Sequence, residues 1–316
     1  MGKKFVGQEY MAATNGKGLH QQSKGNRVLS RLTMIGSVFI TVVSVFIVAF
    51  CLFFQMCPVN GTSMMTTLNA TGEKNKEDKV LTCSLGKPKN GDIVVMKLYA
   101  HDVAEYADLA AAAKGDQTAL NKLHMTQQTA INTLLNDRFS EYDGNGYYEL
   151  IIKRLIGQPG DCISMRCIDD EYFIYLNGEK LNETYLDPMV SSHDKETLNF
   201  KRLWRVLHKT PDAYDIRNWP NYTKYLAANQ DSVVDGIGTA SDYMLIIPDG
   251  YYFVVGDNRG SNSHYLESWD SIRFGPLPIT NYCSSCVDIL DHNTTMPKYL
   301  WQQFVYYVCF GWAWQK

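Results

Sequence analysis

Two residues of this sequence have the chemistry of a hydrolase: a serine in a short stretch of small and apolar residues, and a lysine between apolar neighbours. Ser63 stands in "VNGTSMMTTL" (59–68) and Lys153 in "ELIIKRLIG" (149–157). Peptide hydrolysis needs a nucleophile and a base, and a lysine acts as a base only when its amine is neutral. Burial without a carboxylate partner lowers a lysine pKa of about 10.4 by several units.

The segment 149–157 predicts such a setting if it forms a strand. Side chains alternate along a strand, so Ile151, Lys153 and Leu155 would share one face and the amine would lie among apolar neighbours. Arg154 would face the other way, and its guanidinium stays protonated, so it is excluded as a base. A strand lysine on its own is usually solvated, so the assignment depends on the rest of the chain.

Other catalytic groups find less support. The seven histidines are scattered and form no catalytic or metal-binding pattern. "CSSC" at 283–286 has no second CxxC and no nearby HxxxH, which favours a local disulfide or plain thiols over a redox or metal half-site. We therefore expect no metal and no cofactor.

Four blocks follow one another along the chain: "VNGTSMMTTL", "GDIVV", "KRLIGQPGD" and "IPDGYYFVVGDNR" with a later "DSIRFG". Together they resemble the bacterial type I signal peptidases of the serine–lysine class. The matching positions are Val59, Gly61, Ser63, Met64, Thr67 and Leu68 in the first block, Lys153, Arg154, Gly157, Pro159, Gly160 and Asp161 in the third, and Gly256 to Arg259, Asp270 and Ser271 in the last.

The resemblance implies a membrane-anchored serine endopeptidase that removes signal peptides from exported preproteins. Ser63 would be the nucleophile and Lys153 the base, with the Ser63 backbone N–H as an oxyanion donor. The supporting residues would be Asp257, Asp270 and Arg273, with Ser268 or Ser263 orienting the amine. Ser268 is favoured, because the Ser-x-Asp-Ser spacing survives there.

Three positions depart from the family pattern. Thr66 stands where the family usually has proline, and Gly61 stands where some members carry a second hydroxyl donor to the oxyanion. Arg273 is displaced by one residue from its usual place after Asp-Ser, and we still expect it to form an ion pair with Asp270.

The substrates implied by the resemblance are secretory preproteins with small residues at −1 and −3 of the cleavage site. Met64 and Met65 follow the nucleophile. They are candidates to line such shallow pockets or to contact lipid; packing into the local core is the equally supported alternative.

The elements that would carry this site begin with an uncharged apolar run, Leu32 to Met56, long enough to span a bilayer. Lysines and arginines precede it and the first charge after it is Glu73. The positive-inside rule then places residues 1–31 in the cytoplasm, makes 32–57 a transmembrane signal anchor of the plasma membrane, and puts the rest outside.

The outer part, residues 58–297, predicts a mostly β fold: an antiparallel β-sheet catalytic domain with a helical insertion. Short β-branched and aromatic segments at 91–98, 149–157, 162–168, 172–178 and 250–258 are bounded by turn residues. Residues 99–147 have helical spacing of apolar residues and predict the helical insertion. Residues 189–243 read as a second insertion, and the aromatic 298–316 as an interfacial segment, a second span, or a buried strand and turn.

Composition excludes some function classes. The net charge is −3 and the pI about 6.2, so no basic field indicates nucleic acid. A self-cleaving serine–lysine protease of the phage-repressor type shares the core fold, but the apolar span and the lack of a basic module disfavour it. A surface-binding module with a decayed active site is the remaining alternative, against which the retained serine and lysine argue.

Overall fold

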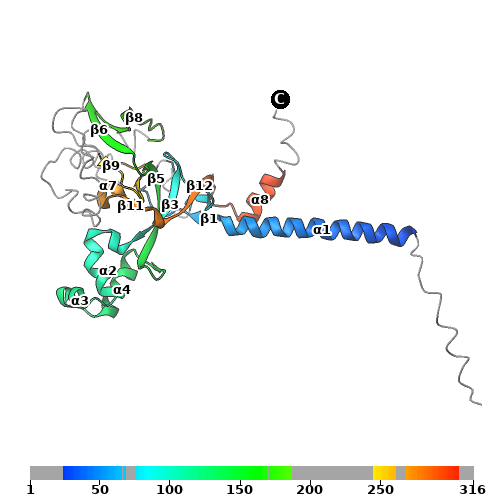
Figure 1. Ribbon diagram of the computed structural model, residues 1–316, viewed down its shortest axis with the longest axis horizontal. Helices are drawn as coiled ribbons and strands as arrows, with labels where there is room; N and C mark the ends of the chain where they lie inside the picture. Colours follow the sequence, from blue (N-terminus) through cyan, green and yellow to red (C-terminus); the bar gives the residue numbers. More distant parts are fainter. Residues whose placement is uncertain are drawn as a thin grey trace, which may run out of the picture. The chain divides into compact units, whose positions relative to one another are not determined.

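The computed structural model describes residues 24–65, 67–68, 76–169, 171–186, 245–260 and 268–305 (Figure 1). Thr66, Ser263, the predicted insertion 189–243 and most of the predicted tail 1–31 lie outside the described residues, as do residues 306–316. The chain divides into two compact units, Met1–Leu52 and Phe53–Lys316.

The first unit contains the long helix α1 (Lys24–Phe53). Its part Val28–Phe53 has a mean hydropathy of 2.7 and side chains that the rest of the protein leaves exposed. Length and composition are those of a membrane-spanning helix. The predicted anchor 32–57 is too long at its end, because residues 54–58 form strand β1 and pair with β2 through the main chain.

The second unit is built on a large antiparallel sheet with the strand order β1-β2-β12-β3-β5-β10-β11, and β4 pairs with β5. The predicted mostly β, antiparallel fold behind one N-terminal apolar helix is confirmed. The strands are β1 (Phe54–Pro58), β2 (Lys79–Cys83), β3 (Ile93–Tyr99), β4 (Glu141–Tyr142), β5 (Tyr147–Gly157), β10 (Tyr251–Val255), β11 (Leu277–Pro278) and β12 (Tyr282–Leu290).

A smaller antiparallel sheet has the order β8-β7-β6-β9. Its apolar residues join those of β10 in a second core cluster that includes Ile163, Ile174 and Phe253. The two sheets approach closely at Gly157 of β5, where a Cβ would lie 3.0 Å from Ile247 Cγ1 and 3.1 Å from Ile163 Cδ1. The strands are β6 (Cys162–Ile168), β7 (Glu171–Leu176), β8 (Glu179–Lys180) and β9 (Leu245–Ile246).

Helices cover one face of the large sheet between β3 and β4. Asp116 and Thr126 cap α3 and α4 by accepting hydrogen bonds from backbone N–H groups of the first turns. Buried side chains of these helices form one core cluster with Ile151 and Leu155 of β5, and Figure 1 shows α2–α4 grouped together beside the sheet. The helices are α2 (Ala107–Ala113), α3 (Gln117–Leu123) and α4 (Gln127–Asp137).

The chain from β12 onward differs from the sequence-based prediction. "CSSC" lies within β12, an inner strand between β2 and β3, although the polar Ser284 and Ser285 gave no strand pattern. Residues 296–305 form helix α8 (Met296–Val305), with Trp301 66% exposed. The described beginning of the C-terminal segment is therefore helical, not a strand.

Candidate active site

The serine lies in the turn that follows β1. Gly61 has a φ of 95°, a backbone conformation that glycine adopts without strain. A residue that follows β10 holds this turn in place. Asn258 donates its backbone N–H to the Ser63 carbonyl oxygen (3.0 Å) and its side-chain amide to the Thr62 carbonyl oxygen (3.0 Å). Within the described residues the Ser63 N–H has no hydrogen-bond acceptor.

The lysine lies on β5, in the middle of the large sheet. Lys153 pairs with Val94 of β3 and is only 3% exposed. Its Nζ lies 2.7 Å from Ser63 Oγ and donates a hydrogen bond to the Ile152 carbonyl oxygen (2.9 Å). The structure thus brings together two side chains that are 90 positions apart in the sequence.

The surroundings of this amine favour its neutral form. Burial lowers the pKa of Lys153 to about 8, against the opposing influence of the Asp270 and Glu149 carboxylates. The described residues include no carboxylate in ion-pair contact with Nζ, so little compensates for the lost hydration. Near pH 8 about half of the molecules would carry a neutral amine within hydrogen-bonding distance of the serine hydroxyl.

The opposite face of β5 carries the neighbouring arginine, which is paired. Arg154 donates Nε and Nη2 to the two Asp257 carboxylate oxygens (2.8 and 2.6 Å) and Nη1 to the Gly91 carbonyl oxygen (2.7 Å). Thr67, just after the nucleophile turn, donates its hydroxyl to Asp257. The buried Asp257 therefore ties the turn to β5, as a supporting residue of the site would.

The second acidic residue holds the backbone behind the site. Asp270 caps the short helix α7 (Ser271–Phe274) by accepting from Ile272 N (3.0 Å), and it also accepts from Gly256 N (3.0 Å). Burial raises the pKa of the Asp270 carboxyl, while the Gly256 bond and the nearby Ser268 hydroxyl act in the opposite direction.

Gly256 is the point where these segments meet. A Cβ at this position would lie 2.3 Å from Ser268 Oγ and 2.4 Å from the Ser63 carbonyl oxygen. No side chain fits between them, so the glycine is required by close approach and not by a positive φ. Ser268 is thereby placed next to the backbone of the nucleophile.

Two supporting interactions expected from the sequence are not formed. Ser268 Oγ is buried but makes no hydrogen bond to Lys153; the Ile152 carbonyl oxygen orients the amine instead. Arg273 makes no ion pair with Asp270. Its guanidinium pairs instead with Glu105 (2.7 Å) and stacks on Trp269.

The two methionines have different environments. Met64 is 2% exposed and packs with Val59, Leu68 and Val80 in a small apolar cluster, while Met65 is only half-buried. The described surface of the nucleophile turn therefore offers Met65 to a ligand more directly than Met64. Partly buried side chains of Cys57, Ile93, Ile152 and Cys286 complete the cluster.

A buried polar pair behind the site was missed by the sequence analysis. Arg259 is fully buried, forms an ion pair with Glu183, and donates Nε to the Gly256 carbonyl oxygen (2.7 Å). Tyr185 donates to Glu183 (2.9 Å), and its ring covers the Arg154 guanidinium at 3.8 Å. Arg259 was visible in the "GDNR" block, but nothing in "LNETY" marks Glu183 as its partner.

The described strands leave part of one edge of β5, beside the lysine, without a partner. On one side the strand pairs with β3 from Tyr148 to Arg154. On the other side it pairs with β4 at Tyr147 and Tyr148 and with β10 from Arg154 onward. In the described part of the chain, the backbone of residues 149–153 therefore has no strand partner on that edge.

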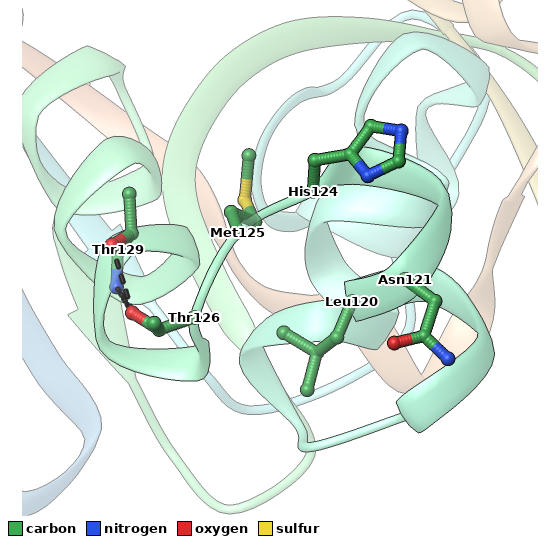
Figure 2. A pocket seen from close by; sticks show the side chains of 6 residues that line it. All are labelled: Leu120, Asn121, His124, Met125, Thr126 and Thr129. Carbon is green, nitrogen blue, oxygen red and sulfur yellow. Dashed lines mark hydrogen bonds between the residues drawn. The ribbon is translucent and has the colours of Figure 1, made fainter.

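Two other features lie outside this arrangement. Cys283 and Cys286 are free thiols in β12, and burial raises the pKa of both, that of Cys286 to about 11. A pocket of about 650 Å³ lies in the helical insertion (Figure 2). Its lining is Leu120, Asn121, His124, Met125, Thr126 and Thr129, none of which belongs to the serine–lysine site.

Comparison with known proteins relates most of the chain to one family. Residues 31–287 match the sequence profile of the family described as "Signal peptidase, peptidase S26". A signal peptidase I from Rickettsia canadensis (strain McKiel) is 29% identical over 131 residues, 42% of this chain and 42% of that protein. One from Rickettsia akari (strain Hartford) is 30% identical over 131 residues, 42% of this chain and 41% of that protein.

The chain thus aligns with less than half the length of these curated relatives. A crystal structure of a signal peptidase I from Enterococcus faecalis V583 has 19% identity to this chain and a TM-score of 0.26. That comparison covers 65% of this chain and 100% of the other.

Proposed function

The chain belongs to the signal peptidase family, peptidase S26, and we propose that it is an endopeptidase that cleaves signal peptides with Ser63 as nucleophile and Lys153 as base. The observation that carries this proposal is the 2.7 Å separation of Lys153 Nζ and Ser63 Oγ at a buried amine whose pKa is about 8. A solvated structural lysine would have neither property.

The reaction begins with proton transfer. The neutral amine of Lys153 takes the proton of the Ser63 hydroxyl while Oγ attacks the carbonyl carbon of the scissile bond. The Ser63 N–H donates to the developing oxyanion. The protonated amine then gives its proton to the leaving nitrogen, and the mature protein departs from a seryl ester.

Deacylation uses the same base. The amine of Lys153, neutral again, removes a proton from water, which attacks the ester and releases the signal peptide. The hydrogen bond from Nζ to the Ile152 carbonyl oxygen keeps the amine in place through both steps. Asp257 and Asp270 bind neighbouring backbone and side chains and hold the nucleophile turn, β5 and α7 together.

The substrate would bind as an added strand. The open edge of residues 149–153 gives the peptide backbone its hydrogen bonds, and the apolar cluster around Met64 lies beside the nucleophile. Small side chains at −1 and −3 of a secretory preprotein fit shallow apolar positions, with Met65 as a contact. The apolar helix Val28–Phe53 would anchor the protein in the plasma membrane, N-terminus inside, next to lipid and substrate.

Two matched pairs of variants test the proposal. Ser63→Ala and Lys153→Met are each expected to abolish cleavage of a preprotein in detergent or proteoliposomes. Ser84→Ala and Lys122→Met change an exposed serine and an exposed lysine outside the site and are expected to cleave normally. Near-normal cleavage by either active-site variant would disprove the dyad.

A serine-reactive penem distinguishes the enzyme from a surface-binding module with a decayed site. Covalent labelling of the wild type, lost in Ser63→Ala, is expected for the enzyme. A correctly folded wild type that resists labelling would favour the binding module, because an inert serine leaves no acyl adduct.

A further inference from the structure

The tryptophan between Ser268 and Asp270 is held by two arginines. The Arg138 guanidinium carbon lies 3.9 Å from the centroid of the Trp269 ring, and that of Arg273 lies 4.1 Å from it. Two guanidinium groups cannot both stack on one face of the same ring at these distances, so the indole lies between them. Indole is the side chain that attracts cations most strongly in this way.

Each of the two cations is also fixed by a carboxylate. Arg138 donates to Glu149 of β5 through Nε (2.9 Å) and Nη2 (2.7 Å). Arg273 donates to Glu105 (2.7 Å). Arg138 and Glu105 belong to the helical insertion, so the insertion is joined to both sides of Trp269.

This clamp (Arg138, Trp269 and Arg273) lies on the same face of the sheet as the lysine. Glu149 and Lys153 are four positions apart on β5 and therefore point to the same side. Trp269 packs against the apolar cluster that contains Ile151. The neighbours of Trp269 in the chain are Ser268, beside the nucleophile backbone, and Asp270, which holds Gly256.

We propose that the helical insertion is a positioning device for catalysis: it clamps Trp269 between Arg138 and Arg273, and the clamped indole fixes Ser268 and Asp270 behind the Ser63–Lys153 pair and keeps water out of the apolar cluster beside Lys153. The inference rests on the proposed peptidase function. Trp269 is a positioning residue, because it acts through its neighbours and makes no contact with the reacting atoms.

The charges around the amine set the direction of the expected change. Lys153 is influenced by Asp270 at the start of α7, Glu149 on β5, Arg138 after α4 and Asp257 after β10. Loss of the indole admits water and reduces the desolvation that lowers the pKa of Lys153. The amine then becomes neutral only at higher pH.

The principal variant is Trp269→Ala in the full-length protein, with Trp269→Phe as the conservative rescue. We expect kcat for preprotein cleavage to fall about 100-fold in Trp269→Ala with KM little changed, because misplacement of reacting groups costs about that factor. The alkaline rise of kcat/KM should move to higher pH, and Trp269→Phe should recover most of both effects.

A second variant guards against misfolding. Arg138→Lys keeps a cation beside Glu149 but loses the planar group that stacks on the indole; it should change kcat and the pH midpoint in the same direction, by less. Lys122→Gln, on the insertion but paired at the surface with Asp108, is the matched control and should behave as wild type.

A readout that does not depend on cleavage separates the clamp from the peptidase function. Competitive acetylation of Lys153 with acetic anhydride, followed by mass spectrometry across pH, measures the amine titration directly. A shift in Trp269→Ala supports the clamp even if no preprotein is cut, and a wild type without cleavage would overturn only the function. Unchanged kcat and unchanged acetylation in both Trp269→Ala and Arg138→Lys would overturn the clamp, as would an effect on KM alone.

Discussion

The two faces of β5 treat neighbouring cations in opposite ways. Arg154 is 8% exposed and meets Asp257 through two hydrogen bonds, with Gly91 as a third acceptor. Lys153 is 3% exposed and meets a serine hydroxyl and one carbonyl oxygen. One buried basic side chain is paired with a carboxylate, and the other has no counter-ion among the described residues.

The difference teaches how one strand can serve both structure and chemistry. A buried charge with a well-oriented partner stays charged, whereas a buried amine without one releases its proton at lower pH. Arg154 joins β5 to Asp257 and hence to the nucleophile turn, and Lys153 is thereby held at a distance suited to proton transfer.

The largest expected effect comes from replacing Lys153 by arginine, so that both faces of β5 carry a guanidinium group. Lys153→Arg places a group that stays protonated beside Ser63. Preprotein cleavage should fall by a factor of about 10⁴ or more at every pH, since removal of a triad residue costs serine proteases that much. Ser63 acylation rates from pH 6 to 10 would show it; recovery of activity at alkaline pH would contradict the role of Lys153 as base.

The second largest effect comes from removing the Asp257 carboxylate, which pairs with Arg154. Asp257→Asn keeps the shape but leaves Arg154 buried without a carboxylate, which should lower the free energy of unfolding by about 3–5 kcal/mol. Urea unfolding in detergent measures it. Asp108→Asn breaks an exposed pair with Lys122 and should cost at most about 1 kcal/mol. Equal costs for the two variants would refute the comparison.

Replacing the buried Lys153 by an uncharged residue should stabilise the protein. The folded-state pKa of Lys153 is about 8, below its unfolded value. The penalty is therefore fully present below pH 8 and disappears as pH rises towards the unfolded value. Lys153→Met should raise the free energy of unfolding at pH 7 by at most about 3 kcal/mol. A stability difference from wild type that persists unchanged at pH 10.5 would contradict this origin.

The smallest effect is the pH dependence of the wild-type enzyme. Because the active form has a neutral amine, kcat/KM should rise about tenfold per pH unit below the midpoint and level off above a pH of about 8. Initial rates of preprotein cleavage at constant ionic strength provide the profile. A midpoint near 6, which is typical of histidine, would point to a different base.

The sequence predicted the two candidate reacting residues better than the residues that hold them in place. The alternation of side chains along 149–157 was enough to place Lys153 and Arg154 on opposite faces. The order of the blocks was enough to select Ser63 among the serines. Both inferences could be made because strand periodicity and block order can be read directly along the chain; the opposite faces are confirmed by the contacts of Lys153 and Arg154, and the role of Ser63 stays a prediction.

Tertiary structure alone decided the partners. Asp257 lies 103 positions from Arg154 and Glu105 lies 168 positions from Arg273. Arg138 reaches Trp269 from the helical insertion, whereas Arg273 follows Trp269 closely in the chain. Strand register and helix packing bring these groups together, and both depend on the whole buried core. The sequence therefore predicted which residues could react, and the fold determined which of the two neighbouring cations pairs with a carboxylate.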